Sequence, residues 1–328
     1  MINFNYKKAA NVKDAVALVS KDNSSMFIAG GTNLVDLMKR GISSPQNLIG
    51  IDQLPLNNIE RTASGNIRIG AMALNSDVAE NELIRSQLPL LSMALNAGAS
   101  PQIRNMATTG GNMMQRTRCS YFYDISMPCN KRNPGSGCAA MNGYNRMHAI
   151  FGASDNCIAV HPSDMCVALV ALDASVHITG NKKDRNVAFK DFHRLPGNTA
   201  QKDNVLENGE LITAVEIPVN RFNKHYHYSK VRDRSSFAFA LVSVAAALDM
   251  DGNNIKNARL AMGGVAHKPW RLFAAEEFLK GKKADEANFK QAAAIAMKDA
   301  KSYGHNEFKL RMAPQAIVNT LNIAANKS

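Results

Sequence analysis

The sequence predicts an α+β protein of two domains. Its 328 residues are about twice the length of an average domain of roughly 150 residues. Apolar strands alternate with helical patterns at the start of the chain, which predicts a βαβ layer. Strand patterns follow one another over residues 226–266, and helical patterns occupy residues 272–326. This order predicts an antiparallel sheet with helices beside it, and a domain boundary near residues 219–225.

The N-terminal βαβ layer rests on four segments. "KDAVALVS" (13–20) has apolar residues at helical spacing. "MFIAGG" (26–31) indicates a short buried strand that ends in a glycine turn, and "TNLVDLMKR" (32–40) indicates the next helix. "NLIGID" (47–52) is the second strand. The glycine turn between strand and helix is of the kind that can bind a ligand.

Further elements follow the βαβ layer. "NIRIGAMAL" (66–74) is strand-like, and residues 76–99 are helical with a break at Pro89. "ENGELITAVEIP" (207–218) predicts another strand. Residues 227–266 are expected to form the strands of one antiparallel sheet in the C-terminal domain.

Composition limits the classes of function. The longest apolar run, Phe237–Leu248, is shorter than the roughly 20 residues of a membrane span, and the N-terminus has no apolar signal region. The net charge of +12 comes from bases spread along the chain without a nucleic-acid-binding aromatic motif. We therefore expect no membrane span and no nucleic acid, and we take the charge to favour anionic cofactors, acidic partner subunits or simply solubility.

Two glycine turns resemble each other chemically. "AGGTN" (29–33) and "ATTGGN" (107–112) both place small residues, hydroxyls and an amide beside backbone N–H groups. Such groups can surround phosphate oxygens, and a helix N-terminus favours their negative charge. One Gly-Gly pair alone is more often only a tight turn. The two together suggest a diphosphate held from two sides.

All five cysteines fall within 48 residues. The first four are separated by 9, 8 and 18 residues, without the paired CxxC spacing of structural zinc sites. Disulfides would need an oxidising compartment and would leave one cysteine over. Four thiolates suit a [4Fe-4S] cluster, and nearby bases would offset its charge; they are Arg116, Arg118, Lys131, Arg132 and Arg146. Iron-sulfur, zinc and disulfides all remain open at this point. Cys166 lies in an apolar helix-like stretch that suits a small buried residue.

Six segments in order resemble the FAD-binding subunit of molybdenum hydroxylases, the family of xanthine dehydrogenase and CO dehydrogenase. They are "AGGTNL", "IRNMATTGGN", "HPSDM", "ENGELITAVEIP", "SKVRDRSSFAFALVSVAA" and "MGGVAHKPWR". The insertion between "TTGGN" and "HPSD" further resembles the flavin and [4Fe-4S] subunit of bacterial periplasmic aldehyde oxidoreductase. The resemblance implies that Cys119, Cys129, Cys138 and Cys157 bind a [4Fe-4S] cluster.

The same resemblance implies a fold and its boundaries. It implies a vanillyl-alcohol oxidase (PCMH) type FAD-binding domain over residues 1–222, with a βαβ subdomain at 1–52 and a second subdomain at 53–222. The [4Fe-4S] insertion would cover about residues 115–160. A CO dehydrogenase flavoprotein-like α+β C-terminal domain would follow at 223–328.

Roles of single residues in FAD binding are also implied by the resemblance. Two segments would hold the diphosphate: Phe27, Ile28, Ala29, Gly30, Gly31, Thr32, Asn33 and Leu34 on one side, and Ala107, Thr108, Gly111 and Asn112 on the other. The remaining residues would contact other parts of FAD: Met114 near the flavin, Ser163 and Asp164 at the ribityl chain, Leu211 or Ile212 over the ring, and Lys230 beside it. Without the resemblance, Asp164 would be read as a helix N-cap and Lys230 as an exposed strand residue.

The resemblance implies that this chain is an electron outlet with no catalytic residue for substrate oxidation. A large subunit with the molybdenum cofactor would oxidise (aromatic) aldehydes to carboxylic acids, and a small subunit with two [2Fe-2S] clusters would pass the electrons on. FAD on this chain would deliver them to an external acceptor. The three chains would form a heterotrimer in the periplasm, exported folded on a partner's signal, or in the cytoplasm.

Two other functions stay open from the sequence. A flavin subunit of a hydroxybenzoyl-CoA reductase-like or xanthine dehydrogenase-like enzyme would serve a different substrate, whose pocket lies on a partner. A zinc-stapled binding protein without catalysis would use the same four cysteines for structure only.

Overall fold

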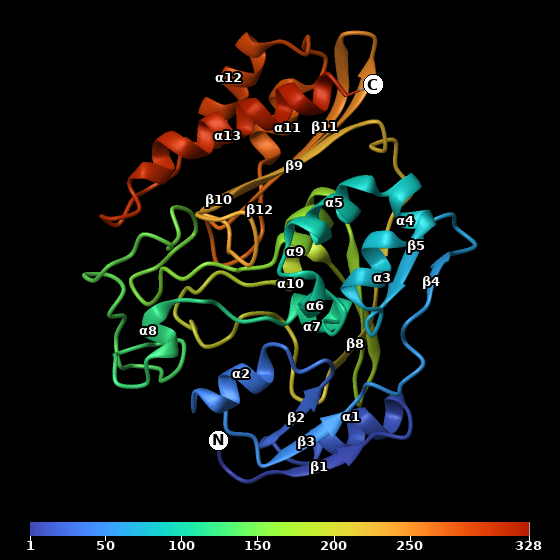
Figure 1. Ribbon diagram of the computed structural model, residues 1–328, viewed down its shortest axis with the longest axis vertical. Coiled ribbons are helices and arrows are strands. Elements are labelled where there is room, and N and C mark those ends of the chain that lie inside the picture. The colour runs from blue at the N-terminus through green and yellow to red at the C-terminus, as the bar shows by residue number, and fades with distance from the viewer. Residues whose placement is uncertain (328) are drawn as a thin grey trace.

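The computed structural model describes residues 1–327 and contains three β-sheets. Figure 1 shows the N-terminal sheet at one end of the molecule, the C-terminal sheet with its three helices at the other, and the remaining sheet and helices between them. Within the described residues, no helix has the length and apolar character needed to cross a membrane.

The N-terminal subdomain is a three-stranded parallel sheet with the order β1-β3-β2. Strands β2 (Ser25–Ile28) and β3 (Asn47–Gly50) flank helix α2 (Leu34–Lys39), which confirms the predicted βαβ unit. Helix α1 (Val12–Ser20) begins at Asn11, whose side chain accepts a hydrogen bond from the Asp14 amide. The first strand, β1 (Asn5–Lys8), was not predicted, because all four of its residues are exposed and show no alternation.

The second subdomain has a five-stranded sheet with the order β4-β5-β8-β6-β7. Its strands are β4 (Ile59–Arg61), β5 (Ile67–Gly70), β6 (Ser175–Thr179), β7 (Asp184–Ala188) and β8 (Leu211–Ile217). Seven helices belong to this subdomain outside the insertion: α3 (Asn75–Glu80), α4 (Glu82–Gln87), α5 (Pro89–Ala97), α6 (Pro101–Arg104), α7 (Thr109–Met113), α9 (Asp164–Ala171) and α10 (Phe189–Phe192). The short helix α8 (Ser120–Tyr123) lies in the insertion. All eight residues of α9 are buried, and α9 packs between α5 and the C-terminal sheet.

The helical stretch 76–99 breaks twice. The predicted break at Pro89 is confirmed, because α5 begins there, where the missing N–H of proline leaves no donor unpaired. A second break falls at Asn81, whose side chain accepts hydrogen bonds from Leu83 and Ile84 and so starts α4. The sequence prediction missed this second break.

The C-terminal domain is an antiparallel sheet with the order β12-β11-β10-β9, covered by three helices. Its elements are β9 (His225–Val231), β10 (Val242–Asp251), β11 (Asn254–Gly263), β12 (Trp270–Arg271), α11 (Phe273–Leu279), α12 (Glu286–Ala296) and α13 (Phe308–Ala325). The predicted antiparallel sheet and helices are confirmed. The prediction of strand structure throughout 227–254 is wrong between β9 and β10, where residues 232–241 form a loop.

The insertion at about 115–160 contains little regular structure beyond α8. Backbone hydrogen bonds from Ile150 and Phe151 to the Val265 carbonyl attach it to the C-terminal domain. The Lys301 amide donates to the Ile150 carbonyl from the loop before α13. The insertion is therefore attached to two segments of the C-terminal domain, although its own backbone forms few strands or helices.

Candidate functional site

A cavity of about 420 Å³ lies where the two subdomains and the β9–β10 loop meet. Its volume falls in the range of about 300 to 1,000 Å³ that is usual for cofactor pockets. Most of the lining comes from four places: the turn after β2 (Thr32, Asn33), the segment from α5 to α7 (Leu95, Gly98, Arg104, Ala107, Gly111, Asn112), the start of α9 (Ser163, Asp164), and β9 with its following loop (Lys230, Asp233, Arg234, Phe239). Asn75 on α3 and Arg118 in the insertion line it as well.

The two glycine turns predicted from the sequence lie directly against each other. A Cβ atom on Gly30 would stand 1.8 Å from the Met106 carbonyl oxygen, so only glycine fits at this contact. Gly31 has φ of +69°, a left-handed conformation that strains any residue with a side chain. The glycine pair therefore brings the β2 turn up to the 107–112 turn, and both line the cavity.

The start of α9 joins the same cavity through two polar residues. The Ser163 hydroxyl accepts from the Cys166 amide as the N-cap and donates to Asn112 Oδ1 over 2.6 Å. Asp164 accepts from the Tyr228 hydroxyl and from Lys230 Nζ, each at 2.7 Å. The Asp164 and Lys230 side chains are 8% and 4% exposed, so this is a buried ion pair. Lys230 is thus not the exposed strand residue that the sequence alone would suggest, and Ser163 rather than Asp164 is the N-cap.

The cavity is suited to a polar, anionic ligand. Arg104, Arg118, Lys230 and Arg234 line it together with only two carboxylates, Asp164 and Asp233. In addition, Asn33 Nδ2 and Asn75 Oδ1, on two of the lining side chains, have no hydrogen-bond partner among the described residues. Buried polar atoms without partners are rare in folded proteins, and a bound ligand commonly satisfies them.

The residues expected to bind the cofactor fall into two groups. Eight line the cavity: Thr32, Asn33, Ala107, Gly111, Asn112, Ser163, Asp164 and Lys230. The other ten do not line it: Phe27, Ile28, Ala29, Gly30, Gly31, Leu34, Thr108, Met114, Leu211 and Ile212. Several of these support the lining; Thr108 caps α7 through its hydroxyl, whereas Leu211 and Ile212 are buried in two apolar cores.

The four insertion cysteines line one small cavity of their own. Cys119, Cys129, Cys138 and Cys157 all contribute to it. Cys129 and Cys138 face each other across an antiparallel bridge, and Asn130 Oδ1 closes that hairpin by accepting from the Gly135 and Gly137 amides. Residues separated by up to 38 positions are thus brought to one place by loop structure, which spacing alone could not establish.

The thiols in this cavity differ in acidity. A hydrogen bond between Cys138 and Cys157 lowers the pKa of the Cys138 thiol to about 6 and raises the pKa of the Cys157 thiol. Burial raises the pKa of Cys119 to about 11. All four are free thiols. Thiolates are metal ligands, and a set of four on one cavity has the donor chemistry of a metal cluster site.

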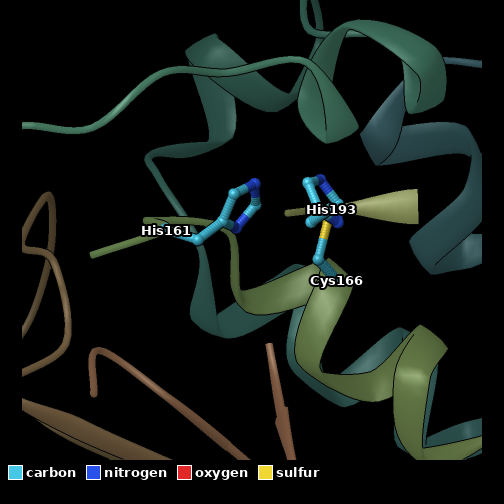
Figure 2. Close-up of side chains that lie close together, drawn as sticks. All are labelled: His161, Cys166 and His193. Carbon is cyan, nitrogen blue, oxygen red and sulfur yellow. The ribbon is translucent and has the colours of Figure 1, made fainter. Parts of the chain in front are cut away.

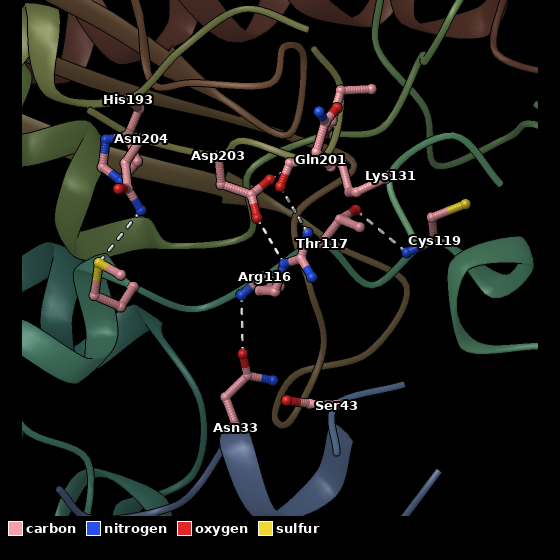
Figure 3. A network of polar contacts seen from close by, with 12 residues as sticks. Asn33, Ser43, Arg116, Thr117, Cys119, Lys131, His193, Gln201, Asp203 and Asn204 are labelled. Atoms are coloured by element: carbon pink, nitrogen blue, oxygen red, sulfur yellow. Dashed lines mark hydrogen bonds and ion pairs between the residues drawn. The ribbon is translucent and has the colours of Figure 1, made fainter. Parts of the chain in front are cut away.

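A partly buried ion-pair network connects the two cavities. Figure 3 shows Asp203 between Arg116 and Lys131, with nitrogen–oxygen distances of 2.6 and 2.5 Å. The Arg116 amide also donates to Asn33 Oδ1 in the first cavity, while Lys131 lines the cysteine cavity. Burial alone would raise the pKa of Asp203, but the Lys131 and Arg116 charges outweigh burial and lower it to about 2.

We expect Asp203→Asn to destabilise the protein by about 2 to 4 kcal/mol, because Lys131, only 2% exposed, would keep a buried charge without its partner. Above about pH 4, the pKa of this carboxyl in the unfolded chain, the ionised carboxylate stabilises the fold fully, and this contribution is lost as the pH falls through its folded-state pKa of about 2. Denaturant unfolding at several pH values should therefore show that the difference in free energy of unfolding between the wild type and Asp203→Asn decreases between pH 4 and 2. Asp233→Asn is the control, since Asp233 is 57% exposed and pairs with Arg146 at the surface; an equal loss there would contradict the network's role.

A third polar group lies behind the start of α9. Figure 2 shows His161, Cys166 and His193 close together, and all three are buried. His193 Nε2 donates to the Met113 carbonyl at 2.9 Å, whereas the Ser163 amide donates to His161 Nδ1 at 3.4 Å. The neutral His161 ring therefore carries its one N–H proton on Nε2, and a metal bound there would require the ring to become an imidazolate. Burial lowers the pKa of His193 to about 4 and holds the pKa of His161 well below its usual range, and we assign this neutral group a packing role.

The sequence prediction missed several lining residues. Arg118, predicted to lie beside the cysteines, and Phe239, predicted to lie in a strand, both line the first cavity. Residues of the 94–104 segment, from the end of α5 to α6, line it as well. His148, 3.1 Å from Cys119 Sγ, was also missed. These residues have no local pattern of their own, and only the position of the segments in the fold brings them to the site.

Comparison with known proteins identifies the families of both domains. Residues 2–220 match the FAD binding domain in molybdopterin dehydrogenase, and residues 224–323 match the CO dehydrogenase flavoprotein C-terminal domain.

Curated relatives and solved structures cover almost the whole chain. The aldehyde oxidoreductase FAD-binding subunit of Escherichia coli K12 is 48% identical over 97% of both chains. The glyceraldehyde dehydrogenase medium chain of Sulfolobus acidocaldarius is 28% identical over 88% of this chain and 85% of its own length. A carbon monoxide dehydrogenase structure from Hydrogenophaga pseudoflava matches with a TM-score of 0.77 and 25% identity over 99% of this chain and 98% of that one. The chain therefore belongs to the FAD-binding subunits of the molybdenum hydroxylase family, and it is an oxidoreductase subunit.

Proposed function

We propose that this chain is the FAD- and [4Fe-4S]-containing electron-transfer subunit of a molybdenum-dependent aldehyde oxidoreductase. The observation that carries the proposal is the pair of neighbouring cavities, one suited to FAD and one lined by four thiols. The 48% identity to an aldehyde oxidoreductase subunit over 97% of the chain supports an aldehyde as the substrate of the whole enzyme. Family membership removes a non-catalytic binding protein from the alternatives.

The residues of the FAD cavity fit the proposed cofactor. Thr32, Asn33 and Gly111 would hold the diphosphate where the two glycine turns meet, because polar and backbone groups converge there beside cationic side chains. Ser163 and the Asp164–Lys230 pair would bind the polar chain and the anionic parts of FAD. Bound FAD would supply a carrier that accepts electrons from one-electron centres and passes them to a different acceptor.

The residues of the cysteine cavity fit a [4Fe-4S] cluster. Four thiols meet in one place, and buried Lys131 lies beside them, where its charge offsets that of a thiolate-bound cluster. Phe122 is fully buried beside the cavity and helps to exclude water.

The partners follow by analogy with the relatives. A large subunit with the molybdenum cofactor would oxidise the aldehyde, and a small subunit with two [2Fe-2S] clusters would relay electrons to this chain, in a heterotrimer. An external acceptor would take them from FAD. We further propose the periplasm as the compartment, reached by export of the folded complex on a partner's signal.

Cofactor analysis of the purified complex tests the proposal. We expect one FAD and about eight iron atoms per complex, of which about four belong to this chain and four to the two [2Fe-2S] clusters of the partner, without stoichiometric zinc. Zinc in place of iron, or a folded chain with neither metal, would contradict the cluster assignment. Fractionation of the native host tests the compartment, since activity confined to the cytoplasm would contradict export.

We expect Asp164→Ala to weaken FAD binding by about 10- to 150-fold. A hydrogen bond to a charged group contributes about 1.5 to 3 kcal/mol, and removal of Asp164 also leaves Lys230 unpaired. Flavin fluorescence titration of the apoprotein measures the dissociation constant. Asp233→Ala is the control, because Asp233 lines the same cavity but is exposed; an effect of equal size there would contradict a specific role of Asp164.

A further inference from the structure

The His148 side chain is buried and lies against one thiol of the cysteine cavity. Only 3% of the residue is exposed, and Nε2 is 3.1 Å from Cys119 Sγ. A thiolate can only accept at this contact, so the neutral ring must carry its proton on Nε2 and donate.

The C-terminal domain holds His148 in position. Lys309, on α13, is fully buried, and its Nζ donates to the His148 carbonyl at 2.9 Å and to the Gly264 carbonyl at 2.7 Å. Asn306 Nδ2 donates to the Ala149 carbonyl at 2.9 Å. Two side chains from one domain thus fix the backbone from which the His148 ring extends toward Cys119.

Cys119 is also the cysteine that faces the FAD cavity. A further cavity of about 150 Å³ is lined by Cys119 and His148 and also by Ser163 and Asp164, which line the FAD cavity as well. Of the four insertion cysteines, Cys119 alone lines this intermediate cavity. Arg118, next to Cys119 in the chain, lines both the intermediate cavity and the FAD cavity.

We propose that His148 is a positioning residue that raises the reduction potential of the [4Fe-4S] cluster by donating a hydrogen bond to Cys119 on the flavin side. This inference rests on the proposed function, because it requires the cluster. When the cluster takes up one electron from a reductant, negative charge on the thiolate sulfurs increases, and an N–H donor at 3.1 Å stabilises that charge. No proton is transferred, and the hydrogen bond only becomes stronger.

Redox titration of three variants within the assembled complex tests this proposal. His148→Leu replaces the ring by a side chain of similar volume that has no N–H donor, and His148→Gln keeps an N–H donor. His177→Leu, the control, removes a histidine on β6 that does not line the cysteine cavity. At the wild-type midpoint, we expect the ratio of reduced to oxidised cluster in His148→Leu to fall about tenfold, which is 59 mV for a one-electron couple. His148→Gln should recover most of this shift, and His177→Leu should behave as the wild type.

The outcomes separate the inference from the proposed function. A His148→Leu protein with full iron content and an unchanged potential overturns the inference and leaves the cluster assignment intact. Wild-type protein without iron overturns the cluster assignment itself. If His148→Leu fails to retain iron, wild-type protein labelled with 15N at histidine alone decides: a hyperfine coupling of a histidine nitrogen to the reduced, paramagnetic cluster is expected, and spectra without that coupling overturn the inference.

Discussion

The Gly31→Val variant is expected to purify with less than about a tenth of the wild-type flavin. Gly31 has φ of +69°, a conformation that costs a residue with a side chain about 1 to 2 kcal/mol and a β-branched one more. A Cβ atom there would also approach Val35 Cγ2 to 3.1 Å. The turn would relax by displacing Thr32 and Asn33 from the cavity, and a loss of about 1.4 kcal/mol in binding already lowers affinity tenfold. Flavin absorbance per chain measures the result.

Gly41→Val is a matched control for this prediction. Gly41 lies just past the other end of α2 and has φ of +70°, with no atom within 4 Å of an added Cβ. It therefore carries the same backbone strain without contact to the cavity, and the variant should lose stability while retaining flavin. Equal flavin loss in both variants would show that general destabilisation, not the position of the turn, governs FAD content.

Cys129→Ser is expected to lose most of the iron of this chain and to destabilise the insertion. Cys129 is one of four thiols on a single cavity, and a hydroxyl is a much poorer ligand for iron than a thiolate. Because the insertion contains little regular structure, a metal cluster would contribute much of its folding energy. Iron analysis and limited proteolysis within residues 115–160 measure the two effects.

Cys166→Ala is the matched control for the cluster. Cys166 is also a fully buried free thiol, but it lies on α9 outside the cysteine cavity. Its replacement should leave the iron content unchanged. Iron lost from Cys166→Ala and kept in Cys129→Ser would mean that the ligand set has been assigned wrongly.

Much of the fold followed from local pattern. The βαβ unit around Gly30 was predictable, because buried strands and an amphipathic helix leave clear periodicities. Strand β1 was not, because a fully exposed edge strand has no such pattern. The loop 232–241 was missed because Phe237–Leu241 continues the apolar run of β10, although Phe237 itself has a left-handed backbone.

The site was predictable only where a residue sits in a motif. The glycine turns and the cysteines stand out in the sequence. In contrast, the two partners of Asp203 lie 72 and 87 residues away along the chain, and the partner of His148 lies 29 residues away. Lys230 shows the same limit: on β9 it resembles an exposed strand residue, and only the packing of α9 brings Asp164 to it. Contacts of this kind depend on tertiary packing, which no local periodicity records.

Single-turnover spectroscopy on complex assembled with the flavin-free Gly31→Val chain shows whether this chain is the electron outlet of its complex. If it is, aldehyde still reduces the molybdenum and [2Fe-2S] centres of the partner subunits once, while steady-state turnover with an acceptor that draws from FAD is lost. Substrate oxidation and acceptor reduction would then use cofactors on different subunits. If aldehyde fails to reduce the partner centres although molybdenum is present and the subunits remain assembled, FAD takes part in substrate oxidation and the outlet account is contradicted.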